Sequence, residues 1–234
     1  MRYSTLLFAA PALATVGYPC YGPDGLAGVC VSDADCAESG GTAIDGACPW
    51  DPAGVRCCSK SPCLEDGAAS ACGWESDCAG TTTPGLCPGG SQVKCCDSLE
   101  NGYGGYEDPT IPAVGACKQT AVDGAAAVVA EFPGRVREIG CIRDCACGSG
   151  SDHCCGMAID FMIADGGGVA TLSGLDIAEW VMNNGASISL KYVIWGQKIW
   201  QVSESPMPWS EWEIMEDRGD ITQNHWDHVH VSFQ

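Results

Sequence analysis

The sequence contains only four histidines, and all of them lie in its C-terminal half. His153 stands in the segment SDHCCGMAID together with Asp160, whereas His225, His228 and His230 stand close together in NHWDHVHV. Zinc accepts imidazole and carboxylate ligands, and a catalytic zinc site uses three protein ligands and leaves a fourth position for water. The residue types therefore predict a zinc centre with an open position.

The spacing of these residues limits how they can meet. His153 and Asp160 are seven residues apart, so the chain must turn between them, and Gly156 gives it the freedom to do so. Asp160 then lies in the apolar strand that follows. Because side chains alternate along a strand, His228 and His230 point to the same face. His230 is then placed to bind the metal, while His228 stands beside the open position.

Periodic apolar segments that would position these residues begin near residue 117. The patterns predict helices over 119–132 and 175–184, strands over 136–142, 156–163 and 228–233, and a hairpin of 191–195 and 198–202 that turns at Gly196-Gln197. The second helix is expected to be capped by Ser173 and to stop at Gly185. Helices and antiparallel strands without regular β-α-β alternation predict a compact α+β domain over residues 113–234.

The N-terminal half differs in sequence pattern, because twelve of the eighteen cysteines lie there in two repeats of six cysteines each. The first repeat contains Cys20, Cys30, Cys36, Cys48, Cys57 and Cys58, and the second contains Cys63, Cys72, Cys78, Cys87, Cys95 and Cys96. Units of about 40 residues bury too little apolar surface to fold alone, so three disulfides per unit are expected. Six cysteines allow 15 pairings, and the spacing does not choose between them.

The predicted order of segments is a signal peptide, two cysteine-rich modules, a linker and a C-terminal domain. Their expected bounds are 1–17, 18–60, 61–98, 99–112 and 113–234. An apolar run after Arg2 followed by small residues is typical of a secretory signal, and the cysteine content is typical of an oxidising compartment. We therefore expect a secreted, extracellular protein.

The composition also narrows the partners. A formal net charge of −19 argues against binding to nucleic acid, which requires Lys and Arg contacts to phosphates. No segment after the signal reaches the roughly 18 apolar residues that a membrane span needs, so no membrane partner is expected. We expect the protein to be a monomer.

Two motifs in the C-terminal half resemble those of a known enzyme group. The pattern S-D-H-x-x-G-x-A-I-D-F-M over 151–162 and D-H-V-H-V-S over 227–232 is similar to the superfamily of zinc D-Ala-D-Ala carboxypeptidases and murein endopeptidases. Within that superfamily it looks closest to a domain of secreted actinobacterial and fungal proteins, and the resemblance covers about residues 110–234. It implies that His153, Asp160 and His230 bind Zn²⁺. It also implies hydrolysis of an amide bond in the stem peptide or cross-link of bacterial peptidoglycan.

The resemblance leaves two candidates for the general base. Part of the superfamily uses a carboxylate at the position of Asp227, and the murein endopeptidase branch uses a histidine at the position of His228, with a further histidine matching His225. Strand geometry favours His228, with Asp227 as the alternative or as its partner. Arg143 matches an arginine of the family and would bind a substrate carboxylate or a developing oxyanion. Its alternative role is a structural ion pair with a neighbouring acid.

The cysteines beside His153 raise another alternative. Cys154 and Cys155 follow it directly, and thiolates bind zinc well. Six cysteines in an oxidised domain are nevertheless expected to form three disulfides.

The two repeats resemble cysteine-rich modules attached to secreted fungal wall-lytic enzymes. This implies that they bind cell wall, with Trp50 and Trp74 as platforms for glycans, while Trp226 is the aromatic residue expected to line the cleft. The alternative to a peptidase is a non-catalytic wall- or glycan-binding protein that keeps the peptidase fold. A third possibility is a disulfide-rich effector or inhibitor with structural zinc, but a structural site should have four ligands.

Overall fold

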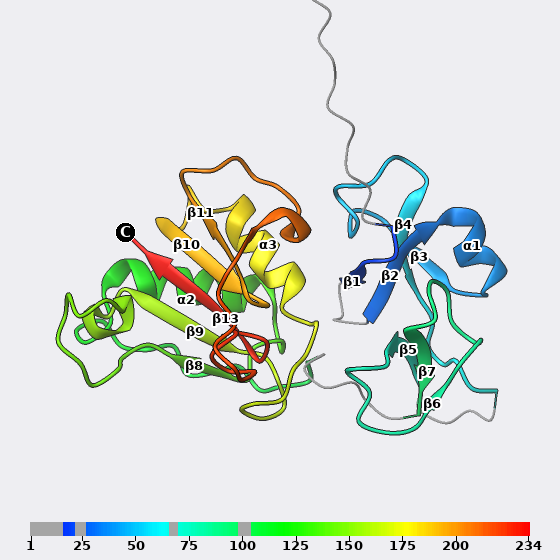
Figure 1. Cartoon of the computed structure of the whole chain (residues 1–234), viewed down its shortest axis with the longest axis horizontal. Helices are drawn as coiled ribbons and strands as arrows, with labels where there is room; N and C mark the ends of the chain where they lie inside the picture. The colour runs from blue at the N-terminus through cyan, green and yellow to red at the C-terminus, as the bar shows by residue number, and fades with distance from the viewer. Residues whose placement is uncertain (1–15, 22–26, 66–69, 98–103) are drawn as a thin grey trace, which may run out of the picture.

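The computed structural model describes residues 16–21, 27–65, 70–97 and 104–234. Most of the predicted signal peptide and the start of the predicted linker lie outside the described residues. Figure 1 shows two small units, one with β1–β4 and α1 and one with β5–β7, beside a larger unit that contains α2, α3 and the strands from β8 onward. The chain is mostly β-structure with few helices, so the prediction of an α+β fold holds only in part. Within the described part of the chain, no helix is both long enough and apolar enough to cross a membrane.

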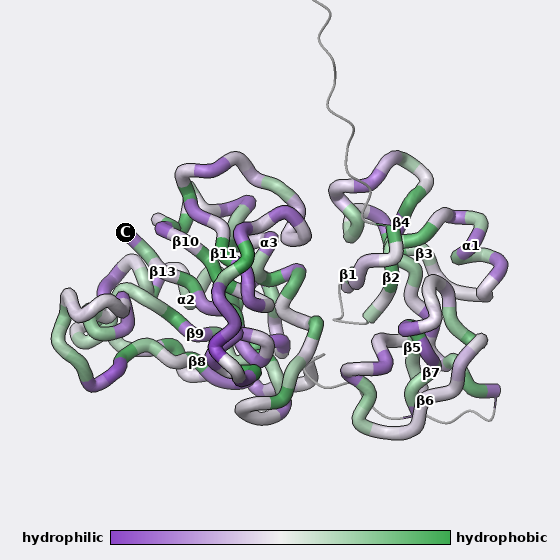
Figure 2. The backbone as a smooth tube through the Cα atoms, viewed as in Figure 1, coloured by the Kyte–Doolittle hydropathy of each residue, from purple (hydrophilic) through white to green (hydrophobic). Residues whose placement is uncertain are grey.

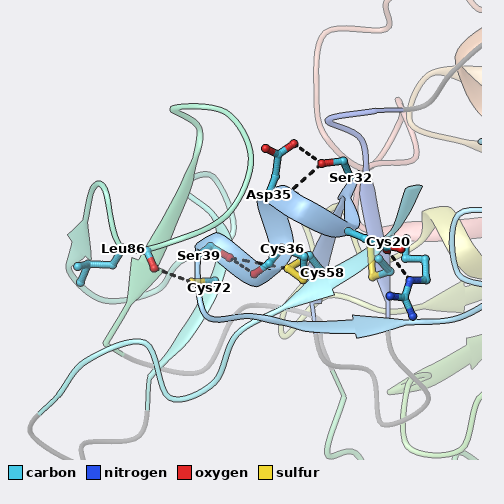
Figure 3. The surroundings of a disulfide bond; sticks show 11 residues. Cys20, Ser32, Asp35, Cys36, Ser39, Cys58, Cys72 and Leu86 are labelled. Atoms are coloured by element: carbon cyan, nitrogen blue, oxygen red, sulfur yellow. Dashed lines mark hydrogen bonds and ion pairs between the residues drawn. A yellow bond between two sulfur atoms is a disulfide. The ribbon is translucent and has the colours of Figure 1, made fainter. Parts of the chain in front are cut away.

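The first repeat, residues 20–58, forms a four-stranded antiparallel sheet in the order β1-β2-β4-β3 and one short helix. Its elements are β1 Pro19–Tyr21, β2 Ala27–Ser32, α1 Asp33–Glu38, β3 Thr42–Ile44 and β4 Val55–Ser59. Helix α1 begins at Ser32, whose hydroxyl accepts a hydrogen bond from the backbone N–H of Asp35 at 3.1 Å, as Figure 3 shows. The helix carries Cys36 inward to its disulfide partner Cys58.

The second repeat, residues 63–96, forms a three-stranded sheet in the order β5-β7-β6. Its strands are β5 Ala71–Trp74, β6 Thr82–Thr83 and β7 Val93–Cys96. Both repeats pair their cysteines in the same way, first with fifth, second with fourth and third with sixth. The bonds are Cys20–Cys57, Cys30–Cys48, Cys36–Cys58, Cys63–Cys95, Cys72–Cys87 and Cys78–Cys96. The repeat in sequence is therefore a repeat in covalent topology.

The C-terminal unit is built on a six-stranded antiparallel sheet in the order β12-β11-β10-β13-β9-β8. Its strands are β8 Glu138–Gly140, β9 Ala158–Met162, β10 Leu190–Trp195, β11 Lys198–Gln201, β12 Glu213–Ile214 and β13 His228–Phe233. Its helices are α2 Gln119–Glu131 and α3 Leu175–Asn183, with short 3₁₀ turns at Asp152–Cys155 and Trp209–Glu211. The elements expected from periodicity are thus present at the predicted places.

One face of this sheet packs against both helices. Alternate residues of the central strands, among them Phe161 and Val231, are fully buried with apolar residues of α2 and α3. Gly124 in α2 allows the close approach, because a Cβ there would lie 2.1 Å from the ring of Phe233. Figure 2 shows hydrophobic residues on the central strands and a largely hydrophilic loop between β12 and β13. The other residues of the same strands, including the histidines of β13, point to the opposite face.

Two details of the prediction need correction. Helix α3 begins at Gly174 without a side-chain cap, so Ser173 does not cap it. Ser173 is buried, and its carbonyl accepts a hydrogen bond from Arg135. Trp74 is only 8% exposed and packs with Val29 and Val93 between the two repeats, so it is no platform for a glycan. Its large apolar area holds the repeats together instead.

The repeats also contact the C-terminal unit through specific polar bonds. The indole N–H of Trp50 donates to Glu179 in α3 at 2.9 Å, and the ring packs against the C-terminal core. The hydroxyl of Tyr21 donates to the carbonyl of Leu172, and the N–H of Leu172 donates to Asp77 in the second repeat at 3.0 Å. Trp50 therefore forms part of the contact between the first repeat and the C-terminal unit.

Candidate metal centre

The three predicted ligands meet on the sheet face that the helices do not cover. His230 in β13 lies directly opposite Asp160 in β9 in the strand register. Nε2 of His153 lies 3.1 Å from Oδ1 of Asp160 and 3.1 Å from Nδ1 of His230, and the last two atoms are 2.8 Å apart. The three side chains are buried and form a group able to hold a metal ion. The structure thus brings the three predicted side chains together.

The turn between His153 and Asp160 forms as expected. His153 lies in the 3₁₀ turn Asp152–Cys155, and Gly156 ends that turn in the left-handed region with φ of 67°. A Cβ at Gly156 would also lie 2.0 Å from the carbonyl oxygen of Ala116, so only glycine fits. Strand β9 then begins at Ala158 and carries Asp160 to the centre.

Hydrogen bonds on the far side of each ring fix which nitrogen faces the centre. Nδ1 of His153 lies 2.7 Å from the carbonyl oxygen of Cys141, which can only accept, so Nδ1 carries the proton and Nε2 is left with a lone pair. Nε2 of His230 lies 3.1 Å from the hydroxyl of Ser232, which leaves Nδ1 for the centre. The ring of Tyr192 stacks on His230 at 5.7 Å. Such outer contacts are typical of histidines that bind metals.

This donor set fits zinc. Two ligand atoms about 2.1 Å from a zinc ion in a tetrahedral arrangement lie roughly 3.4 Å apart, a few tenths of an ångström more than the separations of 2.8–3.1 Å here. Two imidazole nitrogens and one carboxylate oxygen supply three of four positions, as in catalytic zinc sites. Two groups of three cysteines also lie close enough to share an ion, but every one of these cysteines is in a disulfide bond. The groups are Cys20, Cys30 and Cys48, and Cys63, Cys72 and Cys87.

The protonation states are consistent with a site for a cation. Burial alone would raise the pKa of Asp160, but its close contacts with the imidazole rings of His153 and His230 outweigh burial and hold the pKa below its ordinary value. Burial lowers the pKa of His230 despite the opposing charge of Asp160, so its ring is neutral at pH 7. A carboxylate and neutral imidazoles are the forms that bind metals.

His228 stands at the edge of the ligand group. Its Nδ1 lies 2.6 Å from Oδ1 of Asp227, and this carboxylate oxygen accepts a hydrogen bond from the N–H of the ring. Its Nε2 is buried, has no hydrogen-bond partner among the described residues and lies 3.6 Å from Oδ1 of Asp160. The geometry therefore presents a free ring nitrogen beside the three ligand atoms.

Asp227 lies behind His228 rather than facing the ligands. It is fully buried, and its Oδ2 accepts hydrogen bonds from the N–H of Gly168 at 2.7 Å and from the hydroxyl of Thr222 at 2.6 Å. Burial alone would raise the pKa of Asp227, but the hydrogen bonds from His228 and Thr222 lower it to about 2. Asp227 is thus an ionised anchor for the ring of His228.

His225 and Arg143 complete the neighbourhood. The ring of His225 lies 4.8 Å from that of His228, and burial, followed by the charges of His228 and His230, lowers the pKa of His225 to about 3. Nη2 of Arg143 lies 3.2 Å from Oδ2 of Asp160, and its side chain is 57% exposed. Arg143 therefore pairs with a ligand of the centre and still reaches solvent.

All six cysteines of the C-terminal unit are in disulfides, so none binds zinc as a thiolate. The bonds are Cys117–Cys141, Cys145–Cys154 and Cys147–Cys155. All three lie around His153, because Cys141 supplies the carbonyl that orients its ring and Cys154 and Cys155 follow it directly. The cysteines support the centre from outside.

Several supporting residues were not predicted. Ser232 has a sequence signal, because it lies two residues after His230 and so on the same strand face. Tyr192 and Gly168 come from distant segments, and Thr222 lies in the loop five residues before Asp227; none of the three has a sequence signal. Trp226 packs against the rings of Trp195 and Trp209.

Comparison with known proteins assigns the family. Residues 113–226 match the model described as "VldE, C-terminal domain". A protein of the fungus Arthroderma benhamiae, described as an uncharacterized secreted protein, is 47% identical over 242 residues, which cover 97% of this chain and 98% of the relative. No solved structure matches the chain. The chain belongs to the family of this secreted fungal protein and carries a VldE C-terminal domain.

These matches correct one prediction and confirm another. The assignment to the zinc D-Ala-D-Ala carboxypeptidase and murein endopeptidase superfamily is wrong, because the C-terminal half matches the VldE model instead. The motifs behind that assignment are two short runs around a few histidines and aspartates, and such runs describe ligand spacing rather than ancestry. The prediction that the protein is secreted is confirmed by the relative, and the predicted disulfides are present.

Proposed function

We propose that this secreted protein is a zinc-dependent hydrolase that cleaves an amide bond in the peptide part of bacterial peptidoglycan. The observation that carries the proposal is the unpartnered Nε2 of His228 beside the convergent ligand atoms of His153, Asp160 and His230. An open three-ligand site with an adjacent base is the arrangement that hydrolysis requires.

The residues divide the chemistry as follows. His153, Asp160 and His230 would hold the zinc, which when bound would polarise an amide carbonyl and make water more acidic. Nε2 of His228 accepts the proton of the attacking water and returns it to the leaving amine. Asp227 keeps the ring of His228 in the tautomer that this needs and stabilises its positive charge after proton transfer.

Arg143 and His225 would act on substrate and base. The exposed guanidinium of Arg143 suits a peptide with a free carboxylate, because a planar fork binds carboxylates with two hydrogen bonds. His225 stays neutral and lies close to His228, so it fills the space beside the base without adding charge. A peptide with a terminal carboxylate outside the cell matches both Arg143 and secretion, which favours wall peptides over other amides.

The test incubates the purified protein with insoluble peptidoglycan, with and without a chelator, and identifies new termini by mass spectrometry. We expect new amino and carboxyl termini that disappear with chelator and return when zinc is added. His153→Ala should lose zinc, measured by elemental analysis. His228→Gln should keep zinc and lose roughly 100- to 10,000-fold in rate.

Other outcomes separate the alternatives. Sedimentation with peptidoglycan without new termini would overturn the hydrolase and leave a wall-binding protein. Full activity in His228→Gln would refute its role as base. Arg143→Ala is expected to raise KM for a peptide with a free terminal carboxylate and to leave KM for the amidated peptide unchanged.

A further inference from the structure

A cavity of about 620 Å³ lies between the first repeat and helices α2 and α3. Cavities of roughly 300–1,000 Å³ are typical of small-ligand sites, and such sites favour the interfaces between units. The first repeat contributes Tyr21, Ile44 and Asp45 to the wall. Because this wall comes from two units joined through Trp50 and Glu179, the cavity exists only while they are in contact.

The cavity is separate from the candidate metal centre. None of the three ligands, nor His228, lines it. Helix α3 supplies both a buried face toward the sheet, with Ile177 and Val181, and cavity residues such as Trp180. The histidines lie on the other face of that sheet. A ligand in the cavity would therefore leave the centre free.

The wall combines aromatic rings with carboxylates. Phe132 and Trp180 are half-buried, with ring centroids 5.9 Å apart and planes at 86°. Four carboxylate side chains line the cavity, from Asp45, Glu131, Asp176 and Glu179.

The one guanidinium in the wall is already neutralised. Arg135 is buried, lies 2.9 Å from Asp176 in an ion pair and covers the ring of Tyr21 at 5.2 Å. The same pair neutralises Asp176, and Asp45 lies 3.1 Å from Arg56, so the remaining negative charge of the wall comes mainly from Glu131 and Glu179. This charge favours neutral or cationic ligands and disfavours anions.

We propose that this cavity binds a short oligosaccharide built from 2-amino-2-deoxyglucose units. The apolar face of a pyranose ring packs on an aromatic side chain, and its hydroxyl groups donate hydrogen bonds to carboxylates, which only accept. A free amino group would add attraction to the carboxylates and to the ring of Trp180. This deepens the proposed function, on which it rests, because the peptides of peptidoglycan are attached to strands of amino sugars.

Such a site would keep the protein bound to the glycan of an insoluble wall. Tethering to an insoluble polymer raises the effective concentration of the second site. The effective concentration of peptide at the candidate metal centre rises when the polymer is intact, and it does not rise when the peptide is free in solution.

The experiment measures binding of two tetrasaccharides, one of N-acetylglucosamine and one of glucosamine, to the full secreted chain by calorimetry. We expect Trp180→Ala to weaken binding about tenfold, as loss of one aromatic contact predicts, and Trp180→Phe to restore most of it. Glu131→Gln should weaken the glucosamine oligomer more than the acetylated one. Glu213→Gln, which changes an exposed carboxylate on β12 outside the cavity, is the matched control and should change neither.

Binding of either oligomer supports the proposed site. The relative affinity of the two oligomers identifies the natural ligand as an acetylated or a deacetylated wall strand. Absence of binding by both, equal affinity in Trp180→Ala, or binding only of a lysine-rich control peptide would overturn the proposal. Cleavage of a soluble wall peptide is measured in parallel. Unchanged cleavage with lost binding in Trp180→Ala supports the glycan site, whereas binding without any cleavage by the unmodified chain contradicts only the hydrolase.

Discussion

The buried clusters of the two repeats differ in composition from the core of the C-terminal unit. In the first repeat one cluster consists of Cys20, Cys30, Cys48 and Cys57 with a few partly buried neighbours. The C-terminal core instead gathers aliphatic and aromatic residues of strands β9, β10, β11 and β13 and of helices α2 and α3. Two of its disulfides, Cys145–Cys154 and Cys147–Cys155, lie in the loop beside His153, whereas Cys117–Cys141 is buried in the core between the start of α2 and the end of β8.

Disulfide bonds therefore have different roles in the two regions. A unit of about 40 residues cannot bury enough apolar surface, so disulfides restrict its unfolded chain instead. The C-terminal unit is large enough to be stabilised by apolar burial. Its disulfides Cys145–Cys154 and Cys147–Cys155 instead fix the loop that carries His153. Four variants or sets of variants test this difference between the two regions.

The largest effect is expected from Phe161→Ala. Phe161 is fully buried at the centre of β9, so its truncation should cost about 3–5 kcal/mol of the unfolding free energy of the C-terminal unit. Urea unfolding followed by hydrogen exchange should show the repeats still protected. Loss of protection in the repeats during the same transition would mean that the two regions unfold as one, and the contrast would fail.

Next in size is the double change Cys36→Ser with Cys58→Ser. This bond closes a separation of 22 residues, and its loss should cost the first repeat about 3 kcal/mol. Protease digestion should then cut within the first repeat while the thermal transition of the C-terminal unit stays unchanged. A first repeat that resists protease as well as before would show that apolar packing suffices there.

The matched change in the other region is Cys145→Ser with Cys154→Ser. It should leave the melting of the C-terminal core nearly unchanged but release the loop before His153, so zinc affinity should fall about 10- to 100-fold. Competition with a chelating dye measures this affinity, and the Cys36/Cys58 variant is the control that should keep it. Unchanged zinc affinity would remove the proposed role of these disulfides.

The smallest effect concerns pH and the contact between the two regions. Burial raises the pKa of Glu179, against the opposing hydrogen bonds from Trp209 and Trp50. A raised pKa means that the folded state favours the protonated carboxyl, so this stabilisation is full below the ordinary value of 4.5 and is lost as pH rises through the raised pKa. Thermal melts across pH 4–8 should show this decline, and Glu179→Gln should flatten it. An equal slope in both proteins would contradict it.

Much of the local structure was predictable, because it follows from periods of two and about four residues. The hairpin at Gly196-Gln197 and the strand with His228 and His230 on one face both depend on neighbours in sequence. The predicted start of α3 is wrong by one residue, because the helix begins after Gly174, and the hydroxyl of Ser173 is buried without a hydrogen-bond partner among the described residues. The predicted superfamily was also wrong, because it was inferred from two short motifs.

By itself, the sequence determined that His153, Asp160 and His230 could meet, since ligand types, a glycine and strand alternation are local properties. It also determined that the N-terminal half is a duplicated disulfide unit. The tertiary structure decided how the cysteines pair, that Asp227 lies behind His228, and that Trp50 and Trp74 face other parts of the protein. These depend on which distant segments approach in space, and a pattern of neighbours in one chain does not fix that.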